Sequence, residues 1–253
     1  MTRRAMITGA TSGIGRAIAR RLAKEKYDLI LTGRRSERLE ELKREIEQEN
    51  EVGVLTLCFD VREYEQVEQA INSLTGSWES IDILINNAGL AAGLDPIHTG
   101  LLSDWEQMID TNIKGLLYVT RVVSPGMVAR KSGHIINLGS IAGKTVYPNG
   151  VVYCATKHAV KALSEGMRMD FLPYGIRVTE ISPGAVETEF SLVRFKGDQQ
   201  QADKVYAGFT PLVAEDVAEA VCFAVSQPPH VNIQELLIMP TAQANVTMIH
   251  RGK

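Results

Sequence analysis

The segment Ala5-Met6-Ile7-Thr8-Gly9-Ala10-Thr11-Ser12-Gly13-Ile14-Gly15-Arg16 decides the fold. Its apolar beginning predicts a short buried strand, and the stretch from Arg16 to Lys26 predicts a helix with one apolar face. The glycines between them allow a tight turn in which the backbone comes close to a ligand, and the N-terminus of the helix offers free N–H groups. Because this turn opens a strand-turn-helix unit, we predict that it binds the pyrophosphate of a nucleotide. A plain tight connection is the alternative.

The rest of the chain alternates between strand-like and helix-like segments. Strands are predicted at residues 28–32, 54–59, 81–85, 134–138, 177–182 and 235–239, and helices at 36–50, 64–74 and 103–131. The last helix is expected to begin with a capping box at Ser103 and Glu106 and to kink at Pro125-Gly126. This alternation is typical of an α/β fold in which helices cover both faces of a parallel sheet. The 253 residues are expected to form a single domain with seven strands.

The second predicted strand ends in Gly33-Arg34-Arg35, about 20 residues beyond the last glycine of the turn. A site for NAD usually carries an acidic residue here, which binds the 2′-hydroxyl of the ribose. Two arginines instead offer planar, charged donors where a 2′-phosphate would lie. The alternative is that they only solvate the start of the next helix, where their charge would oppose the helix dipole. We therefore predict NADP as the dinucleotide.

Tyr153 and Lys157 stand four residues apart, and Tyr153 follows Ser140 by thirteen residues. In a helix this spacing puts the phenol and the ammonium on one face. A free phenol has a pKa of about 10, and a lysine cation together with an oxidised nicotinamide ring favours the phenolate. A chance pair on an exposed helix is the alternative, but Ser140 follows a predicted strand at the edge where α/β sheets bind ligands. The three residues therefore indicate proton transfer coupled to hydride transfer.

The composition bounds the partners of the protein. The chain is 45% hydrophobic and 23% charged, and its net charge of −3 offers no basic surface for nucleic acid or an anionic membrane. The sequence contains no recognisable signal peptide and no apolar run of the roughly 20 residues that span a bilayer, so a cytoplasmic location is expected. The cysteines Cys58, Cys154 and Cys222 lack metal-ligand spacing, and no metal site is predicted.

The motifs together resemble the short-chain dehydrogenase/reductase family over essentially the whole chain. The resemblance rests on Thr8-Gly9-x-x-x-Gly13-x-Gly15, on Asn86-Asn87-Ala88-Gly89, on Ser140 with Tyr153-x-x-x-Lys157, and on Pro183-Gly184. It implies an oxidoreductase with a doubly wound Rossmann fold and a lid after the sixth strand, at approximately residues 187–210.

The family resemblance also implies roles for individual residues. Tyr153 would be the general acid and base, and Ser140 would orient the substrate oxygen. Lys157 would lower the pKa of Tyr153 and hold the nicotinamide ribose, and Asn112 would support a water in a proton relay. Cofactor contacts are implied at Gly9, Ala10, Thr11, Ser12, Gly13, Ile14, Arg34, Arg35, Asp60, Val61, Asn87, Ala88, Gly89, Tyr153, Lys157, Pro183, Gly184, Val186 and Thr188.

Several further segments, among them 108–112 and 193–198, are similar to bacterial NADP-dependent dehydrogenases of short 3-hydroxy acids. This similarity implies L-serine, L-allo-threonine, 3-hydroxypropionate or 3-hydroxyisobutyrate as the substrate, or the matching oxo acids, and a homotetramer. Ser140 and Tyr147 are expected to contact the substrate, and Arg194 to bind its carboxylate. Pairing of Arg194 with the acidic residues at 187, 189 or 198 is the alternative. The competing functions are reduction of neutral ketones, sugars or steroids, and a catalytically silent NADP-binding regulator.

Overall fold

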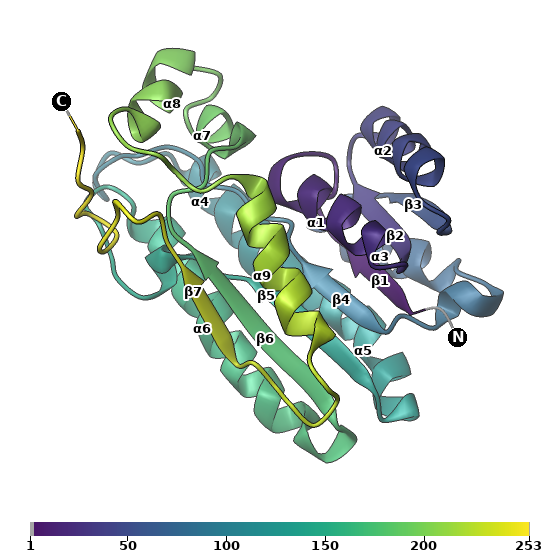
Figure 1. Ribbon diagram of the computed structural model, residues 1–253. Helices are drawn as coiled ribbons and strands as arrows, with labels where there is room; N and C mark the ends of the chain where they lie inside the picture. Colours follow the sequence, from purple (N-terminus) through teal and green to yellow (C-terminus); the bar gives the residue numbers. More distant parts are fainter. Residues whose placement is uncertain (1–2, 253) are drawn as a thin grey trace.

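The computed structural model describes residues 3–252, in which the strands form one parallel sheet (Figure 1). Across the sheet the strands follow the order β3 (Val54–Cys58), β2 (Asp28–Gly33), β1 (Arg4–Ile7), β4 (Ile83–Asn86), β5 (Gly133–Leu138), β6 (Ile176–Pro183) and β7 (Glu235–Ile238). The predicted seven-stranded parallel sheet is therefore confirmed. Since β1 pairs with both β2 and β4, the order reverses there and opens a crevice at the carboxyl ends of the strands.

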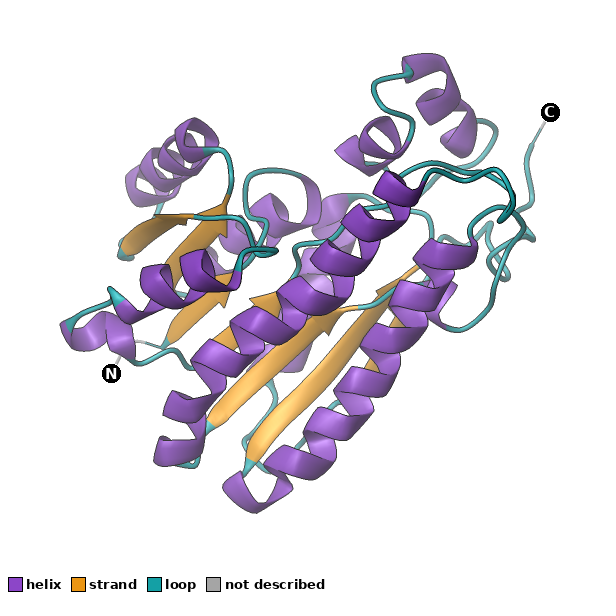
Figure 2. Ribbon diagram, turned by 180° about the vertical axis from the view of Figure 1, so that it is seen from behind, coloured by secondary structure: helices purple, strands orange, loops and turns teal. Residues whose placement is uncertain are grey.

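Helices cover both faces of the sheet. One face carries α1 (Gly13–Lys24), α2 (Ser36–Glu49) and α9 (Ala214–Ser226). The other face, seen in Figure 2, carries α3 (Tyr64–Asn72), α5 (Leu116–Arg130) and α6 (Val151–Phe171), with α4 (Leu102–Ile109) packed against α6. Short 3-10 helices span Gly76–Glu79, Ile141–Gly143 and Leu172–Tyr174.

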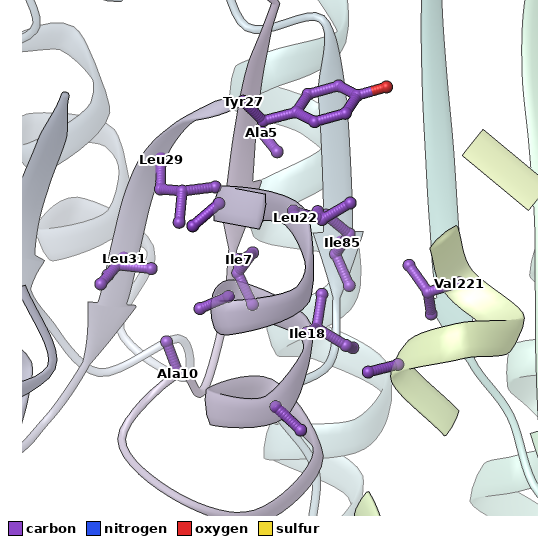
Figure 3. Close-up of a cluster of buried hydrophobic side chains, with 14 of the residues drawn as sticks. Ala5, Ile7, Ala10, Ile18, Leu22, Tyr27, Leu29, Leu31, Ile85 and Val221 are labelled. Carbon is purple, nitrogen blue, oxygen red and sulfur yellow. The ribbon is translucent and has the colours of Figure 1, made fainter. Parts of the chain in front are cut away.

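The hydrophobic core lies between the sheet and the helices on each of its two faces. Strand residues such as Ile7, Leu29 and Leu31 are fully buried against Ile18 and Leu22 of α1 (Figure 3). Burying each such side chain contributes about 1.5–3 kcal/mol. Strands that are covered on both faces therefore consist of nearly continuous apolar runs, which explains why their positions could be predicted within about two residues.

The predicted long helix at 103–131 is wrong in its details. The chain forms α4, then a π-helix at Asp110–Gly115, then α5. Leu101 is the N-cap residue and makes no side-chain cap, so Ser103 does not form the predicted capping box. The interruption lies at the π-helix. Helix α5 continues through Pro125, and the kink expected at Pro125-Gly126 stays a prediction. A π-helical turn inserts an extra residue into the helical ladder, and such turns are frequent at functional sites.

Helices α7 (Glu189–Arg194) and α8 (Gln199–Tyr206) follow β6 and lie beyond one end of the sheet (Figure 1). They occupy most of the predicted lid at 187–210. The two ends of this segment lie next to each other, because Val186 before α7 and Leu212 after α8 form a parallel β-bridge. Within residues 3–252, no helix has the length and apolar character needed to cross a membrane.

Candidate active site

The turn between β1 and α1 lies against the end of β4. Gly9 has a φ of +66°, and a Cβ at this position would come 3.0 Å from the Cα of Ala88. Gly13 also has a positive φ, of +51°. Side chains are strained in this region of backbone conformation, so both positions favour glycine. Since α1 begins at Gly13, the free N–H groups of its first turn lie at the turn itself, as binding of a pyrophosphate requires.

Asn87 fastens this turn to the neighbouring strand. Its Nδ2 donates to the carbonyl oxygens of Thr8, at 2.8 Å, and Gly9, at 3.1 Å. In return, Oγ1 of Thr8 accepts hydrogen bonds from the backbone N–H groups of Asn87 and Ala88, both at 3.0 Å. The carboxyl ends of β1 and β4 are thereby joined where the crevice opens.

The two predicted phosphate-binding arginines lie at the end of β2. Nη2 of Arg35 donates to Oγ1 of Thr11 at 2.6 Å and to Oγ of Ser12 at 2.9 Å, which orients the guanidinium against the turn. Nη1 of Arg34 lies 3.7 Å from Oδ2 of Asp60. Both side chains are therefore presented along the rim of the crevice, as the NADP prediction requires.

Glu189 adds a contact that the sequence did not reveal. Its Oε1 accepts a hydrogen bond of 3.0 Å from Nη1 of Arg38, and its Oε2 lies 3.5 Å from Nη1 of Arg35. Glu189 is the first residue of α7, so these ion pairs tie the predicted lid to the arginines at the end of β2. Nothing in the local sequence indicated this link, because the partners lie about 150 residues apart.

Ser140, Tyr153 and Lys157 come together from β5 and α6. Ser140 lies two residues after the end of β5, and its Oγ accepts a hydrogen bond from the backbone N–H of Ala142 at 3.1 Å. Nζ of Lys157 donates to the carbonyl oxygen of Leu138 at 2.8 Å and lies 6.0 Å from the ring centroid of Tyr153. All three predicted catalytic side chains are buried and line the same cleft.

Burial shifts the pKa values of both ionisable groups in this set. Burial raises the pKa of Tyr153 above its ordinary value and Tyr147 raises it further, while the hydroxyl of Ser140 and the guanidinium of Arg194 act in the opposite direction. Burial also lowers the pKa of Lys157 to about 8. Nζ of Lys157 binds a carbonyl, and both groups are desolvated. The lowered pKa of Tyr153 that the resemblance implies therefore stays a prediction for the site with the oxidised cofactor bound. The positive charge of an oxidised nicotinamide ring would act in the lowering direction.

Asn112 lies in the π-helix behind the cleft. Its Oδ1 accepts from the backbone N–H of Leu90 at 2.9 Å, and its Nδ2 donates to the carbonyl of Leu90 at 2.8 Å and to Oγ1 of Thr156 at 3.0 Å. The side chain therefore joins the loop after β4 to α6. It does not line the cleft, and its support of a relay water stays a prediction.

Arg194 projects from the end of α7 towards the predicted catalytic tyrosine. Its Nε donates to the carbonyl oxygen of Gly93 at 3.1 Å, and its Cζ lies 5.4 Å from the ring centroid of Tyr147 and 5.8 Å from that of Tyr153. Its Nη2 is buried and, within residues 3–252, has no hydrogen-bond partner. A buried donor of this kind is costly to leave unpaired and is suited to binding an anion.

One cleft of about 680 Å³ unites these elements. The predicted residues that line it are Gly9, Thr11, Ser12, Gly13, Ile14, Arg34, Arg35, Asp60, Val61, Asn87, Ala88, Gly89, Ser140, Tyr147, Tyr153, Lys157, Pro183, Gly184, Val186, Thr188 and Arg194. Ala10 does not line the cleft, because its side chain is buried in the core against α1, and its predicted contact with the cofactor stays a prediction.

The C-terminal segment completes the wall of the cleft and was missed. Gln243, Ile249 and Arg251 line it, and Oε1 of Gln243 accepts from the backbone N–H of Ala185 at 2.8 Å. Phe190 of α7 also lines it, with its ring centroid 5.7 Å from that of Tyr153. These residues belong to no recognisable motif and reach the cleft only through the tertiary path of the chain.

Comparison with known proteins decides the family. Residues 3–198 match the family model described as short chain dehydrogenase. The chain belongs to the short-chain dehydrogenase family. It is 49% identical over 249 residues to an NADP-dependent 3-hydroxy acid dehydrogenase of Salmonella typhi, covering 98% of this chain and 99% of the relative. It is also 48% identical to sulfoacetaldehyde reductase 2 of Chromohalobacter salexigens, covering 94% of each chain.

A solved structure shares the whole architecture. The closed form of a serine dehydrogenase complexed with NADP+ superposes with a TM-score of 0.92 at 48% identity, covering 98% of this chain and 99% of the other. These comparisons confirm the predicted family and fold. As a member of the short-chain dehydrogenase family, the protein is an oxidoreductase that acts on CH–OH groups.

Proposed function

We propose that the protein is an NADP-dependent dehydrogenase of short 3-hydroxy acids, which oxidises the hydroxyl group at carbon 3 and, in reverse, reduces the oxo acid. The similar 3-hydroxy acid dehydrogenase and serine dehydrogenase support this class. The observation that carries the substrate class is Arg194, a guanidinium in the cleft with a buried Nη2 that lacks a partner among the described residues.

NADP is the cofactor, and the residues of the cleft fit it. The turn at Gly9 lacks the Cβ that would press on Ala88, which leaves room for close approach of a pyrophosphate. Arg35, held by Thr11 and Ser12, offers charged donors to a 2′-phosphate. When bound, NADP supplies the nicotinamide carbon that accepts or returns the hydride.

The protein's own residues supply the geometry and the proton. The phenolate of Tyr153 removes the proton of the substrate hydroxyl during oxidation, and the phenol returns a proton to the carbonyl oxygen during reduction. Ser140, whose hydroxyl lies at the end of β5, donates to the same substrate oxygen. Lys157 binds the ribose hydroxyls and holds a positive charge near Tyr153. Asn112 orders the loop after β4 and supports the relay water.

We assign the substrate carboxylate to Arg194 because, within residues 3–252, it forms no ion pair with Glu187, Glu189 or Asp198, and two of these carboxylates are engaged elsewhere. Glu189 pairs with Arg35 and Arg38. Asp198 caps α8 by accepting from the backbone N–H of Gln201 at 3.0 Å. Among residues 3–252, Arg194 forms no ion pair, and its Nε is fixed by the carbonyl of Gly93. The guanidinium is thus positioned beside Tyr153 and free to bind a carboxylate a short distance from the reacting carbon.

Substitution of Arg194 by methionine tests this assignment. Arg194→Met should lower kcat/KM for 3-hydroxypropionate and L-serine by about 10², since a charged hydrogen bond contributes roughly 2–3 kcal/mol, and should change the neutral methyl ester of 3-hydroxypropionate little. Arg251→Met is the matched control, because Arg251 also lines the cleft but donates to the carbonyls of Val205 and Ala207. Equal losses for the acid and its ester would show that Arg194 only orders α7.

A second substrate class follows from the sulfoacetaldehyde reductase relative. A sulfonate presents oxygen acceptors to a guanidinium much as a carboxylate does. The NADP(H) absorbance assay should therefore include sulfoacetaldehyde and 2-hydroxyethanesulfonate beside L-allo-threonine, 3-hydroxyisobutyrate and neutral ketones. Higher kcat/KM for the sulfonates would reassign the physiological substrate while leaving Arg194 as its anchor. Turnover of neutral ketones alone would overturn the proposal, and absence of any turnover would favour the regulator.

The assembly is proposed to be a homotetramer in the cytoplasm. Support for assembly comes from large apolar side chains that are exposed at α4 to α6 and just beyond, namely Ile109, Leu117, Met169 and Leu172. Sedimentation of the purified protein should give four times the mass of one chain. A monomer at micromolar concentration would contradict the tetramer, and cell fractionation tests the location.

A further inference from the structure

Glu180 is a buried carboxylate in the middle of β6. Its exposed fraction is 1%, and its Oε1 accepts a hydrogen bond of 2.6 Å from Oγ of Ser182. An ionised carboxylate is expensive to bury unless it is hydrogen-bonded and lies near a positive charge. One hydroxyl satisfies only part of its acceptor capacity. The position of Glu180 therefore calls for a cation nearby.

The carboxylate lies directly behind the segment that carries the predicted catalytic serine. A Cβ added at Gly139 would collide with Oε1 of Glu180, so the glycine leaves the space that the carboxylate fills. Gly139 separates Ser140 from Leu138, and the carbonyl of Leu138 accepts from Nζ of Lys157 at 2.8 Å. Glu180 is thus packed against the one residue that links the acceptor of Lys157 to the serine.

Lys157 is the cation that this arrangement provides. Its side chain is buried, and burial lowers its pKa to about 8. Glu180 is the charged group that acts against this lowering. Tyr153, one turn earlier on α6, carries no charge until it ionises. Lys157 and Glu180 thus lie on either side of the Leu138–Gly139 backbone at the end of β5, where the negative charge of Glu180 favours the protonated form of Lys157.

The other charged groups around Glu180 are engaged elsewhere. Glu235, the register partner of Glu180 in β7, pairs with Lys144 at 2.6 Å. Arg168 of α6 donates to the backbone carbonyls of Val178 and Gln234. The register partner of Glu180 in β5 is the uncharged Asn137. Within residues 3–252, neither Arg168 nor Lys157 forms an ion pair, but Lys157 binds the carbonyl of Leu138, next to the Gly139 position against which Glu180 packs, and is therefore the cation that we assign to Glu180.

We propose that Glu180 is a positioning residue that keeps the buried Lys157 protonated, through its carboxylate behind Gly139. The inference rests on the proposed role of Lys157 in binding the ribose and stabilising the phenolate of Tyr153. Glu180 acts on the reaction only through Lys157 and touches neither substrate nor cofactor. It determines how far into alkaline conditions the site retains its positive charge.

The pH profile tests this role. Glu180→Gln keeps the shape of the side chain and removes its charge, so the high-pH limb of kcat/KM for hydroxy acid oxidation, measured at saturating NADP, should move about 1 pH unit lower. The sign follows because a lysine that loses its counter-charge deprotonates at lower pH. Glu180→Asp keeps the charge and should restore the limb at least in part. A residue that only packs would lower the yield or the melting temperature and leave the limb in place, which would overturn the proposal.

A stability cycle tests the pair independently of catalysis. Lys157→Met leaves Glu180 as an uncompensated buried charge and should lower the melting temperature. Adding Glu180→Gln removes that charge, so the double variant should melt at a higher temperature than Lys157→Met alone. A double variant that melts lower, as independent losses predict, would overturn the coupling. Because this measurement needs no substrate, it separates failure of the pairing from failure of the proposed function.

Discussion

Cofactor selectivity offers a direct test of how the end of β2 works. The change is the double substitution Arg34→Ala/Arg35→Ala. The guanidinium of Arg35 is already oriented by hydrogen bonds of 2.6 and 2.9 Å to Thr11 and Ser12, so little ordering remains to be done when a phosphate binds. A charged hydrogen bond contributes about 1.5–3 kcal/mol. NAD has no 2′-phosphate and loses no such contact.

Solvent exposure sets the size of the expected effect. The side chains of Arg34 and Arg35 are 57% and 44% exposed, so screening by water and salt reduces the combined contribution. We take about 2–3 kcal/mol for the pair, which corresponds to roughly 30- to 150-fold weaker binding of NADP. The Kd of NAD should change less than about threefold, a threshold equal to roughly 0.65 kcal/mol.

Isothermal titration calorimetry with NADP and NAD gives both constants on the same protein. Arg20→Ala is the control, because Arg20 lies on α1, pairs with Glu45 at 2.5 Å and does not line the cleft. The NADP affinity of the wild type should also fall with added salt more steeply than that of the double variant. Equal weakening of NADP and NAD would refute the assignment of these arginines to the 2′-phosphate.

Three further predictions concern the proton, the lid and the core. Tyr153→Phe should lower kcat at least 10²-fold while the Kd of NADP stays nearly unchanged, and retained turnover would remove Tyr153 from the mechanism. Glu189→Gln frees Arg35 and Arg38 from a competing carboxylate, so calorimetry should show NADP bound about two- to fivefold more tightly and NAD unchanged, whereas weaker NADP binding would contradict the competition. His134 is buried, which lowers its pKa from 6.5 to about 3. Below pH 6.5 the unfolded chain therefore binds a proton at this histidine that the folded chain does not bind. At pH 5 this lowers the free energy of unfolding by about 2 kcal/mol, so His134 should lower the melting temperature by about 4–8 °C between pH 7.5 and 5.0. His134→Gln should lack that part of the drop and the exposed His230→Gln should keep it; identical drops in all three proteins would contradict the assignment.

Much of the fold follows from the sequence because its strands are buried on both faces. Apolar runs such as those of β2 and β6 have few other structures open to them, and the polar residues after them mark the edge where the cleft forms. The family motifs predicted the set of Ser140, Tyr153 and Lys157, which the structure brings to one cleft.

The misses arise where tertiary contacts override local pattern. The π-helix within 102–130 forms around Asn112, whose amide is bound by Leu90 and Thr156 from other elements. The four-residue spacing of Tyr153 and Lys157 predicts a shared helix face. It does not show that the ammonium of Lys157 binds the carbonyl of Leu138, or that burial raises the pKa of Tyr153. The sequence likewise held no signal for the C-terminal wall, because its residues reach the cleft only through the path of the chain.

The bridge between Val186 and Leu212 has a consequence for how substrate range changes. The backbone N–H of Glu187 donates to the carbonyl of Leu212 at 2.8 Å, and the N–H of Leu212 donates to the carbonyl of Ala185 at 3.0 Å. These hydrogen bonds hold the two ends of the α7–α8 segment side by side, so the segment leaves the sheet and returns to it at one place. Because both ends lie at one place, changes in the length or sequence of this segment need not move the strands that it joins. Arg194, the proposed substrate anchor, lies in this segment, whereas the residues proposed to transfer the proton lie on β5 and α6 outside it.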